Sequence, residues 1–67
     1  MEDLDYEGRR IIIGYEGQIL KVVPTDESVQ FDEFDEEVEN LSPDTPAGIY
    51  VQLVSGGGEV LAEHYVA

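Results

Sequence analysis

Most ionisable side chains of this chain are carboxylates, and they are concentrated in one stretch. Residues 26–39 hold eight of the sixteen Asp and Glu residues of the 67-residue sequence. Paired carboxylates act as general acid and base only in a pocket that shifts their pKa values, and a chain of this length has little room for one. We therefore expect these carboxylates to bind a partner rather than to catalyse a reaction.

Three other features could carry chemistry, and each has a simpler structural explanation. The chain has no cysteine, and no serine lies near His64 in the sequence. His64 therefore indicates neither a zinc site nor a catalytic triad. The segment 55–58 lacks the lysine and the helix that follow a phosphate-binding loop, which favours a hairpin turn. Residues 32–44 lack the glycine of an EF-hand loop. We expect no enzyme activity, no cofactor and no metal site.

The net charge restricts the class of partner. Sixteen acidic residues against three basic ones give a net charge of −13 at pH 7. This charge repels nucleic acid and anionic membranes, and it favours a basic protein surface instead. No run approaches the roughly 18 apolar residues that a membrane span needs, and the acidic start is the opposite of a signal peptide. We expect a cytoplasmic protein with a single domain over residues 1–67, of which 1–8 would be frayed.

The apolar residues predict two β-hairpins, over residues 9–24 and 48–67. In the first, the β-branched run Ile11–Ile13 and the apolar run Gln18–Val23 flank a turn that contains two glycines. In the second, an alternating strand precedes Ser55–Gly58, and a second strand follows this turn. The simplest assembly places the two hairpins in one sheet.

The acidic stretch between the hairpins predicts an amphipathic helix over roughly Phe31–Asn40. Its end is indicated by Asn40 and by a proline three residues later. Four large apolar residues recur at helical spacing and are expected to pack on the sheet: Phe31, Phe34, Val38 and Leu41. Two alternatives remain open: a short strand over residues 29–31, or an earlier start to the helix with Thr25 or Asp26 as N-cap.

These elements assemble most simply into an α+β fold of ββαββ order. Four antiparallel strands would form one sheet, and the helix would cover one of its faces. The alternative is a five-stranded, partly open barrel, in which residues 4–6 or 29–31 supply the fifth strand. The uncovered face would offer a surface for dimerisation or for a partner. Its candidate residues are Ile12, Ile19, Val23, Tyr50, Val54, Leu61 and Tyr65.

The acidic residues of the predicted helix oppose its stability. Like charges at positions i and i+4 cost a helix about 0.2–0.5 kcal/mol per pair, and Glu37 and Glu39 would lie near the helix C-terminus, where the macrodipole disfavours negative charge. A sequence selected for stability alone would carry lysines there, so we assign the acids to partner binding. The candidate residues are Asp26, Glu27, Asp32, Glu33, Asp35, Glu36, Glu37, Glu39 and Asp44.

Carboxylates spaced about 5–6 Å apart along a helix form an array similar to the phosphates of a nucleic-acid backbone. In size and charge the chain resembles the small acidic inhibitors, many of them phage-encoded, that block restriction enzymes, nucleases or CRISPR complexes by imitating DNA. The resemblance implies a non-enzymatic inhibitor that occupies the basic groove of a nucleic-acid-processing protein. If the chain is phage-encoded, its place of action would be the host cytoplasm.

Two further hypotheses explain the acidity differently. Proteins of haloarchaea are also rich in Asp and Glu and poor in lysine, and this chain has one lysine. Salt adaptation would scatter the acids, however, whereas residues 48–67 hold only two of them and 26–39 hold eight. The third hypothesis is an acidic–aromatic segment whose Phe31 and Phe34 enter a partner's groove, which would require both rings to be exposed.

Overall fold

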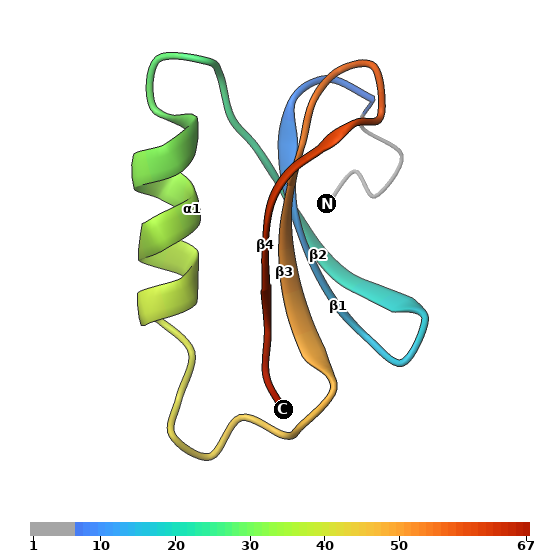
Figure 1. The fold of residues 1–67 in the computed structure, drawn as a ribbon, viewed down its shortest axis with the longest axis vertical. Helices are drawn as coiled ribbons and strands as arrows, with labels where there is room; N and C mark the ends of the chain where they lie inside the picture. The colour runs from blue at the N-terminus through green and yellow to red at the C-terminus, as the bar shows by residue number, and fades with distance from the viewer. Residues whose placement is uncertain (1–6) are drawn as a thin grey trace.

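The fold has the predicted α+β architecture. A computed structural model of the chain describes residues 7–67 (Figure 1). Its elements are β1 (Arg10–Tyr15), β2 (Gln18–Pro24), α1 (Gln30–Glu39), β3 (Ile49–Val54) and β4 (Val60–Tyr65). This order confirms the ββαββ prediction. The predictions of a frayed end or an edge strand before residue 7 lie outside the described residues, and Glu7 and Gly8 are not in a strand.

The four strands form one open antiparallel sheet in the order β2-β1-β3-β4. The central strands are β1 and β3, and β2 and β4 are its edges, so the sheet is not closed into the alternative barrel. Strand β2 ends at Pro24, which lacks an N–H and is tolerated on an edge strand. Helix α1 stands on one side of this sheet and connects β2 to β3 (Figure 1). Within residues 7–67, none of the helical structure is long and apolar enough to cross a membrane.

Each hairpin is closed by a turn whose chemistry is visible in the sequence. The β1–β2 turn consists of Glu16 and Gly17, which have φ angles of 47° and 82°. Positive φ at both central residues is typical of a type I′ turn, whose twist matches that of the flanking strands. In the β3–β4 turn, the hydroxyl oxygen of Ser55 accepts hydrogen bonds from the backbone N–H groups of Gly57 (3.3 Å) and Glu59 (3.1 Å).

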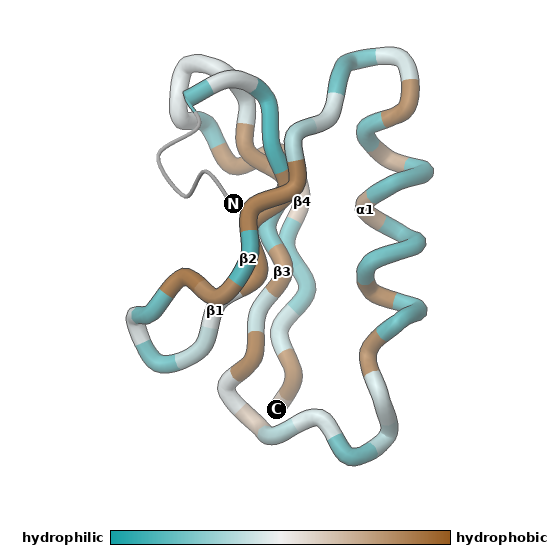
Figure 2. Tube along the Cα trace, turned by 180° about the vertical axis from the view of Figure 1, so that it is seen from behind, coloured by the Kyte–Doolittle hydropathy of each residue, from teal (hydrophilic) through white to brown (hydrophobic). Residues whose placement is uncertain are grey.

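The core lies between α1 and the two central strands. Ile11, Val51 and Leu53 are fully buried there, and Phe34 of α1 packs against them. The register explains why these residues meet, because Ile11 lies directly opposite Leu53 in the β1–β3 ladder. Figure 2 shows hydrophobic positions along the strands, whereas most of α1 is hydrophilic. One narrow side of the helix therefore supplies all of its apolar contacts with the sheet.

The prediction that Phe31 belongs to this core is wrong. Its side chain is 54% exposed, whereas Gln30 is 8% exposed. Successive residues are rotated by roughly 100° around a helix, so the side that carries Phe34 and Val38 can include Gln30 or Phe31 but not both equally. The position goes to Gln30 because its side-chain oxygen accepts a hydrogen bond from Arg9 Nη1 at 2.7 Å.

Both alternatives for the start of the helix are also wrong. Residues 29–31 do not form a strand, because α1 begins at Gln30 with Val29 as its N-cap. Val29 provides no side-chain hydrogen bond to the helix, and neither Thr25 nor Asp26 occupies the cap. The side-chain oxygen of Asp26 instead accepts hydrogen bonds from the N–H and hydroxyl of Ser28, which closes a turn before the helix.

Two residues predicted for the uncovered face of the sheet, Val23 and Leu61, pack against the core instead. The register shifts in both hairpins, at Leu20 in β2 and at Leu61 in β4. An extra residue in one strand reverses the alternation of side chains beyond it. Ile19 and Val23 therefore lie on opposite faces, because Ile19 pairs with Gly14 and Val23 pairs with Ile11.

The two phenylalanines of α1 should respond very differently to truncation. Phe34→Ala should lower the free energy of unfolding by about 3–5 kcal/mol, because it leaves a cavity in the core. Phe31→Ala should cost about 1 kcal/mol or less, because the ring is already half in water. Urea denaturation followed by circular dichroism measures both values. Equal losses for the two variants would contradict this placement of the helix.

Candidate functional site

The side chains of α1 divide into three groups around the helix. The apolar group consists of Phe34 and Val38, which Leu41 continues beyond the helix end. A polar seam, which we define as Gln30, Glu33 and Glu37, is buried or half-buried beside it. An acidic stripe of exposed carboxylates remains: Asp32, Asp35, Glu36 and Glu39. The three groups follow from helical periodicity, which separates residues of one face by three or four positions.

The polar seam holds α1 to the β1–β2 hairpin. Its three members each contact a side chain of that hairpin or of its flanks. The contacts are Arg9 Nη1 to Gln30 Oε1 (2.7 Å), Thr25 Oγ1 to Glu33 Oε1 (2.8 Å) and Lys21 Nζ to Glu37 Oε1 (3.6 Å). Two of the predicted partner-binding residues, Glu33 and Glu37, are thus directed toward the sheet. Their carboxylates stabilise the fold and are less available to a partner.

The acidic stripe occupies positions i, i+3, i+4 and i+7 of the helix and faces water. Neighbouring carboxylates along such a stripe lie about 5–6 Å apart at Cβ. None of its four members forms an ion pair or a side-chain hydrogen bond among residues 7–67. The last turn of α1 also lacks a basic residue. The structure thus brings four predicted site residues together on one surface, at a cost to the stability of the helix.

The three predicted residues at the margins lie in the loops at the two ends of α1. Asp26 and Glu27 precede the helix, and Asp44 follows it. All three are exposed. Hydrogen bonds from the side chain and the backbone of Ser28 hold the pKa of Asp26 below its ordinary value. These residues extend the negative surface beyond the acidic stripe without joining it.

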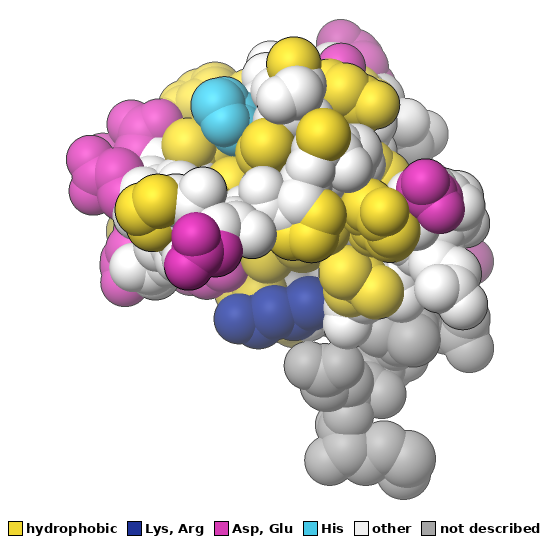
Figure 3. All heavy atoms as spheres, turned by 90° about the horizontal axis from the view of Figure 1, so that it is seen from below, with side chains coloured by type: hydrophobic (Ala, Val, Ile, Leu, Met, Phe, Trp, Pro, Cys, Tyr) yellow, Lys and Arg dark blue, Asp and Glu magenta, His cyan; other side chains and the backbone are white. Residues whose placement is uncertain are grey.

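The basic side chains turn away from the acidic stripe. Arg9 and Lys21 contact the polar seam. Arg10 Nη1 donates to backbone carbonyl oxygens at the start of the described chain and in the β3–β4 turn, of which Gly8 is the closest at 2.9 Å. Figure 3 shows the molecule from one end: a group of acidic side chains lies on the left, on the side of the helix, other acidic side chains lie on the right, and hydrophobic ones cover the middle.

Other sites for chemistry are limited. Among residues 7–67 no three His, Asp or Glu side chains are placed to hold a metal ion. His64 is exposed on the edge strand β4, opposite Val51 in the ladder. An open cavity of about 430 Å³ lies next to Glu16, Tyr50 and Tyr65. Sequence reasoning missed this cavity, although Tyr50 and Tyr65 were placed on one face of the sheet.

The turn before α1 makes a testable prediction about Asp26. Ser28→Ala should raise the pKa of Asp26 toward the ordinary value, because it removes the hydroxyl donor. A pKa lowered by folding stabilises the protein above the pKa of the unfolded state, and this contribution disappears as the pH falls through the lower folded value. NMR titration of the carboxyl carbons measures the shift. Ser42→Ala, in the loop after the helix, should leave the pKa of Asp26 unchanged.

Salt should stabilise the protein over a limited range. The acidic stripe contains four neighbouring like-charge pairs of about 0.2–0.5 kcal/mol each, so screening should raise the free energy of unfolding by roughly 1–2 kcal/mol. Most of the gain should appear below about 0.5 M NaCl, because the Debye length falls to about 3 Å at 1 M. Denaturation curves at several salt concentrations measure it. A stability that keeps rising to several molar would instead indicate salt adaptation.

Comparisons with known proteins add no further guide to this site. Searches against protein-family models, curated proteins and solved structures found no match to the chain. The geometry of the described residues is therefore the basis for assigning a role to this site. Its main features are a surface of four outward carboxylates, basic side chains that face elsewhere, and a cavity on the opposite face of the sheet.

Proposed function

We propose that this protein is a non-catalytic binding protein whose acidic stripe occupies a basic, nucleic-acid-binding surface of another protein. The observation that carries the proposal is the exposure of Asp32, Asp35, Glu36 and Glu39 as one continuous surface. The chain contains three basic residues, and none of them lies against this surface in the described structure. The negative charge of the stripe is therefore available to a partner.

The spacing of the stripe supports a nucleic-acid mimic over a generic acidic surface. Four carboxylates are spread over roughly 10 Å of helix, at 1.5 Å per residue, so their mean separation along the axis is about 3.5 Å. Successive phosphates of one DNA strand rise by about 3.4 Å. A groove whose lysines and arginines are arranged for phosphates would therefore meet a similar linear density of charge.

This function gives the carboxylates electrostatic roles only. The stripe would compete with DNA or RNA for the partner's basic residues, and association would be fast and sensitive to salt. A net charge of −13 opposes direct binding to nucleic acid or to an anionic membrane. Partners of this kind, such as nucleases, restriction enzymes or CRISPR complexes, would place the protein in the cytoplasm, which is the host's cytoplasm if the chain is phage-encoded.

Two variants of equal charge test the proposal. The stripe variant carries Asp35→Asn, Glu36→Gln and Glu39→Gln, and the control carries Glu7→Gln, Glu59→Gln and Glu63→Gln, all exposed positions outside the helix. The wild-type protein and both variants are immobilised and exposed to a bacterial lysate at low salt. The wild type and the control should retain the same basic nucleic-acid-binding protein. The stripe variant should retain at most about one tenth of the amount of this partner that the wild type retains. Captured proteins are identified by mass spectrometry.

Competition then decides whether the captured surface is the nucleic-acid site. Duplex DNA should displace the partner from the wild-type protein, because both ligands would need the same lysines and arginines. Equal capture by the stripe variant and the control would contradict a dedicated surface. A partner that binds DNA and this protein at the same time would contradict mimicry. The stripe variant should also be at least as stable as the wild type, since it removes like-charge pairs.

A further inference from the structure

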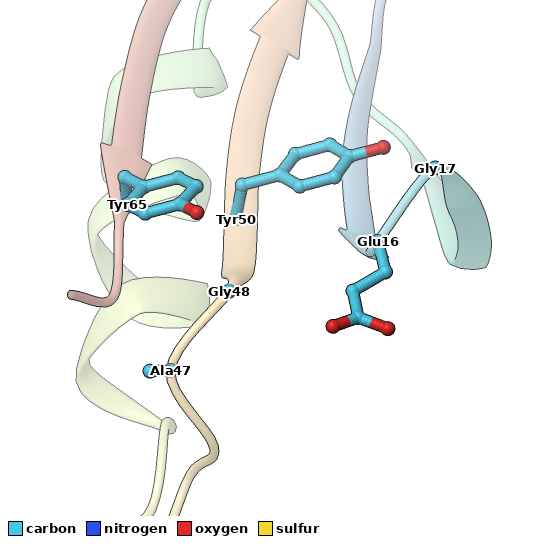
Figure 4. Close-up of a pocket in the computed structure, with 6 residues that line it drawn as sticks. All are labelled: Glu16, Gly17, Ala47, Gly48, Tyr50 and Tyr65. Atoms are coloured by element: carbon cyan, nitrogen blue, oxygen red, sulfur yellow. The ribbon is translucent and has the colours of Figure 1, made fainter.

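The open cavity lies on the face of the sheet opposite α1. Tyr50 and Tyr65 pair directly across the β3–β4 ladder and form its aromatic wall. Glu16 and Gly17 of the β1–β2 turn border it on another side, and Ala47 and Gly48 complete it. In Figure 4 the rings of Tyr50 and Tyr65 lie in front of the strands, and the helix lies behind the strands. The cavity is thus separated from the acidic stripe by the sheet.

Several residues in or beside this cavity have a residue type or a backbone conformation that lowers local stability. Gly14 is a glycine inside a central strand, where it weakens the sheet. The ring of Tyr50 lies across Gly14, and a β-carbon at that position would overlap its outer atoms. Glu16 has a φ of 47°, in a turn that favours Asn, Asp or Gly. Strain of this kind concentrates at functional sites. Tyr65 adds a ring that is 62% exposed.

The chemistry of the walls points to a cation. Two tyrosine rings supply negative π-faces, and the Glu16 side chain supplies a carboxylate. Among residues 7–67, no lysine, arginine or histidine lines the cavity. Arginine matches such walls better than lysine does, because its planar guanidinium stacks on an aromatic face while its N–H groups donate to a carboxylate.

We propose that the cavity formed by Tyr50, Tyr65 and Glu16 binds an arginine side chain of a basic partner protein. The guanidinium would lie against the tyrosine rings and donate hydrogen bonds to Glu16. Gly14 has a defined role here, because its missing side chain lets the Tyr50 ring lie across the strand as part of the aromatic wall. The proposal does not depend on the acidic stripe, which lies on the other side of the sheet.

The probe for this site is the peptide acetyl-Gly-Arg-Gly-amide, titrated at 0.15 M NaCl to screen the net charge. The ring resonances of Tyr50 and Tyr65 should shift and saturate in NMR spectra. The matched peptide with citrulline in place of arginine has the same shape without the charge and should produce no saturable shift. Tyr65→Leu should weaken arginine binding by about two- to fivefold, the usual range for an exposed cation–π contact.

Glu16→Asn and Glu59→Gln separate the site from the bulk charge. Both remove one negative charge, but Glu59 lies in the β3–β4 turn, away from the cavity. Glu16→Asn should weaken binding by about two- to fivefold while it stabilises the protein, because Asn-Gly suits a type I′ turn. Glu59→Gln should leave binding within about twofold. Equal effects of these two variants would overturn the proposal, and so would equal shifts with the citrulline peptide or with a matched peptide that carries lysine in place of arginine.

Discussion

The packing of one side of α1 on the sheet is the contact on which the rest of the structure depends. A helix of ten residues is too short to be stable alone in water, and the like-charge pairs of the acidic stripe weaken it further. It has no side-chain N-cap and no basic residue in its last turn. Its stability therefore comes from Phe34 against Ile11, Val51 and Leu53, and from the polar seam beside them.

This arrangement also determines which carboxylates can meet a partner. Arg9, Thr25 and Lys21, in or beside the β1–β2 hairpin, contact the three residues of the polar seam. The carboxylates of Glu33 and Glu37 therefore have partners within the fold. The carboxylates of the acidic stripe have no such hydrogen-bond or ion-pair partners in residues 7–67. The fold thus concentrates unpaired charge on the side of the helix that faces away from the sheet. A surface of this kind favours encounters with basic proteins through long-range attraction.

The two proposed surfaces would bind cations through different physical interactions. The acidic stripe offers charge density to several basic side chains at once, and its binding should weaken steeply as salt is added. The cavity at Tyr50 and Tyr65 offers shape and π-faces to a single side chain, so its binding should depend less on salt. The stripe contains like-charge pairs that repel each other within one helix, and the cavity is bordered by the strained turn at Glu16. Both depart from what local stability would favour.

The order of elements, the turn positions and the acidic character of the helix can all be predicted from the sequence. These features depend on local patterns: β-branched runs, glycines in turns, and apolar residues at helical spacing. The burial of Gln30 in place of Phe31 becomes visible only in the packed fold, because it depends on a contact with Arg9, twenty-one residues away. The bulges at Leu20 and Leu61 likewise reversed the expected faces of Val23 and Leu61, since register is a property of paired strands. For the same reason, only the packed fold shows which of the nine predicted acids belong to the polar seam, to the acidic stripe or to the margins.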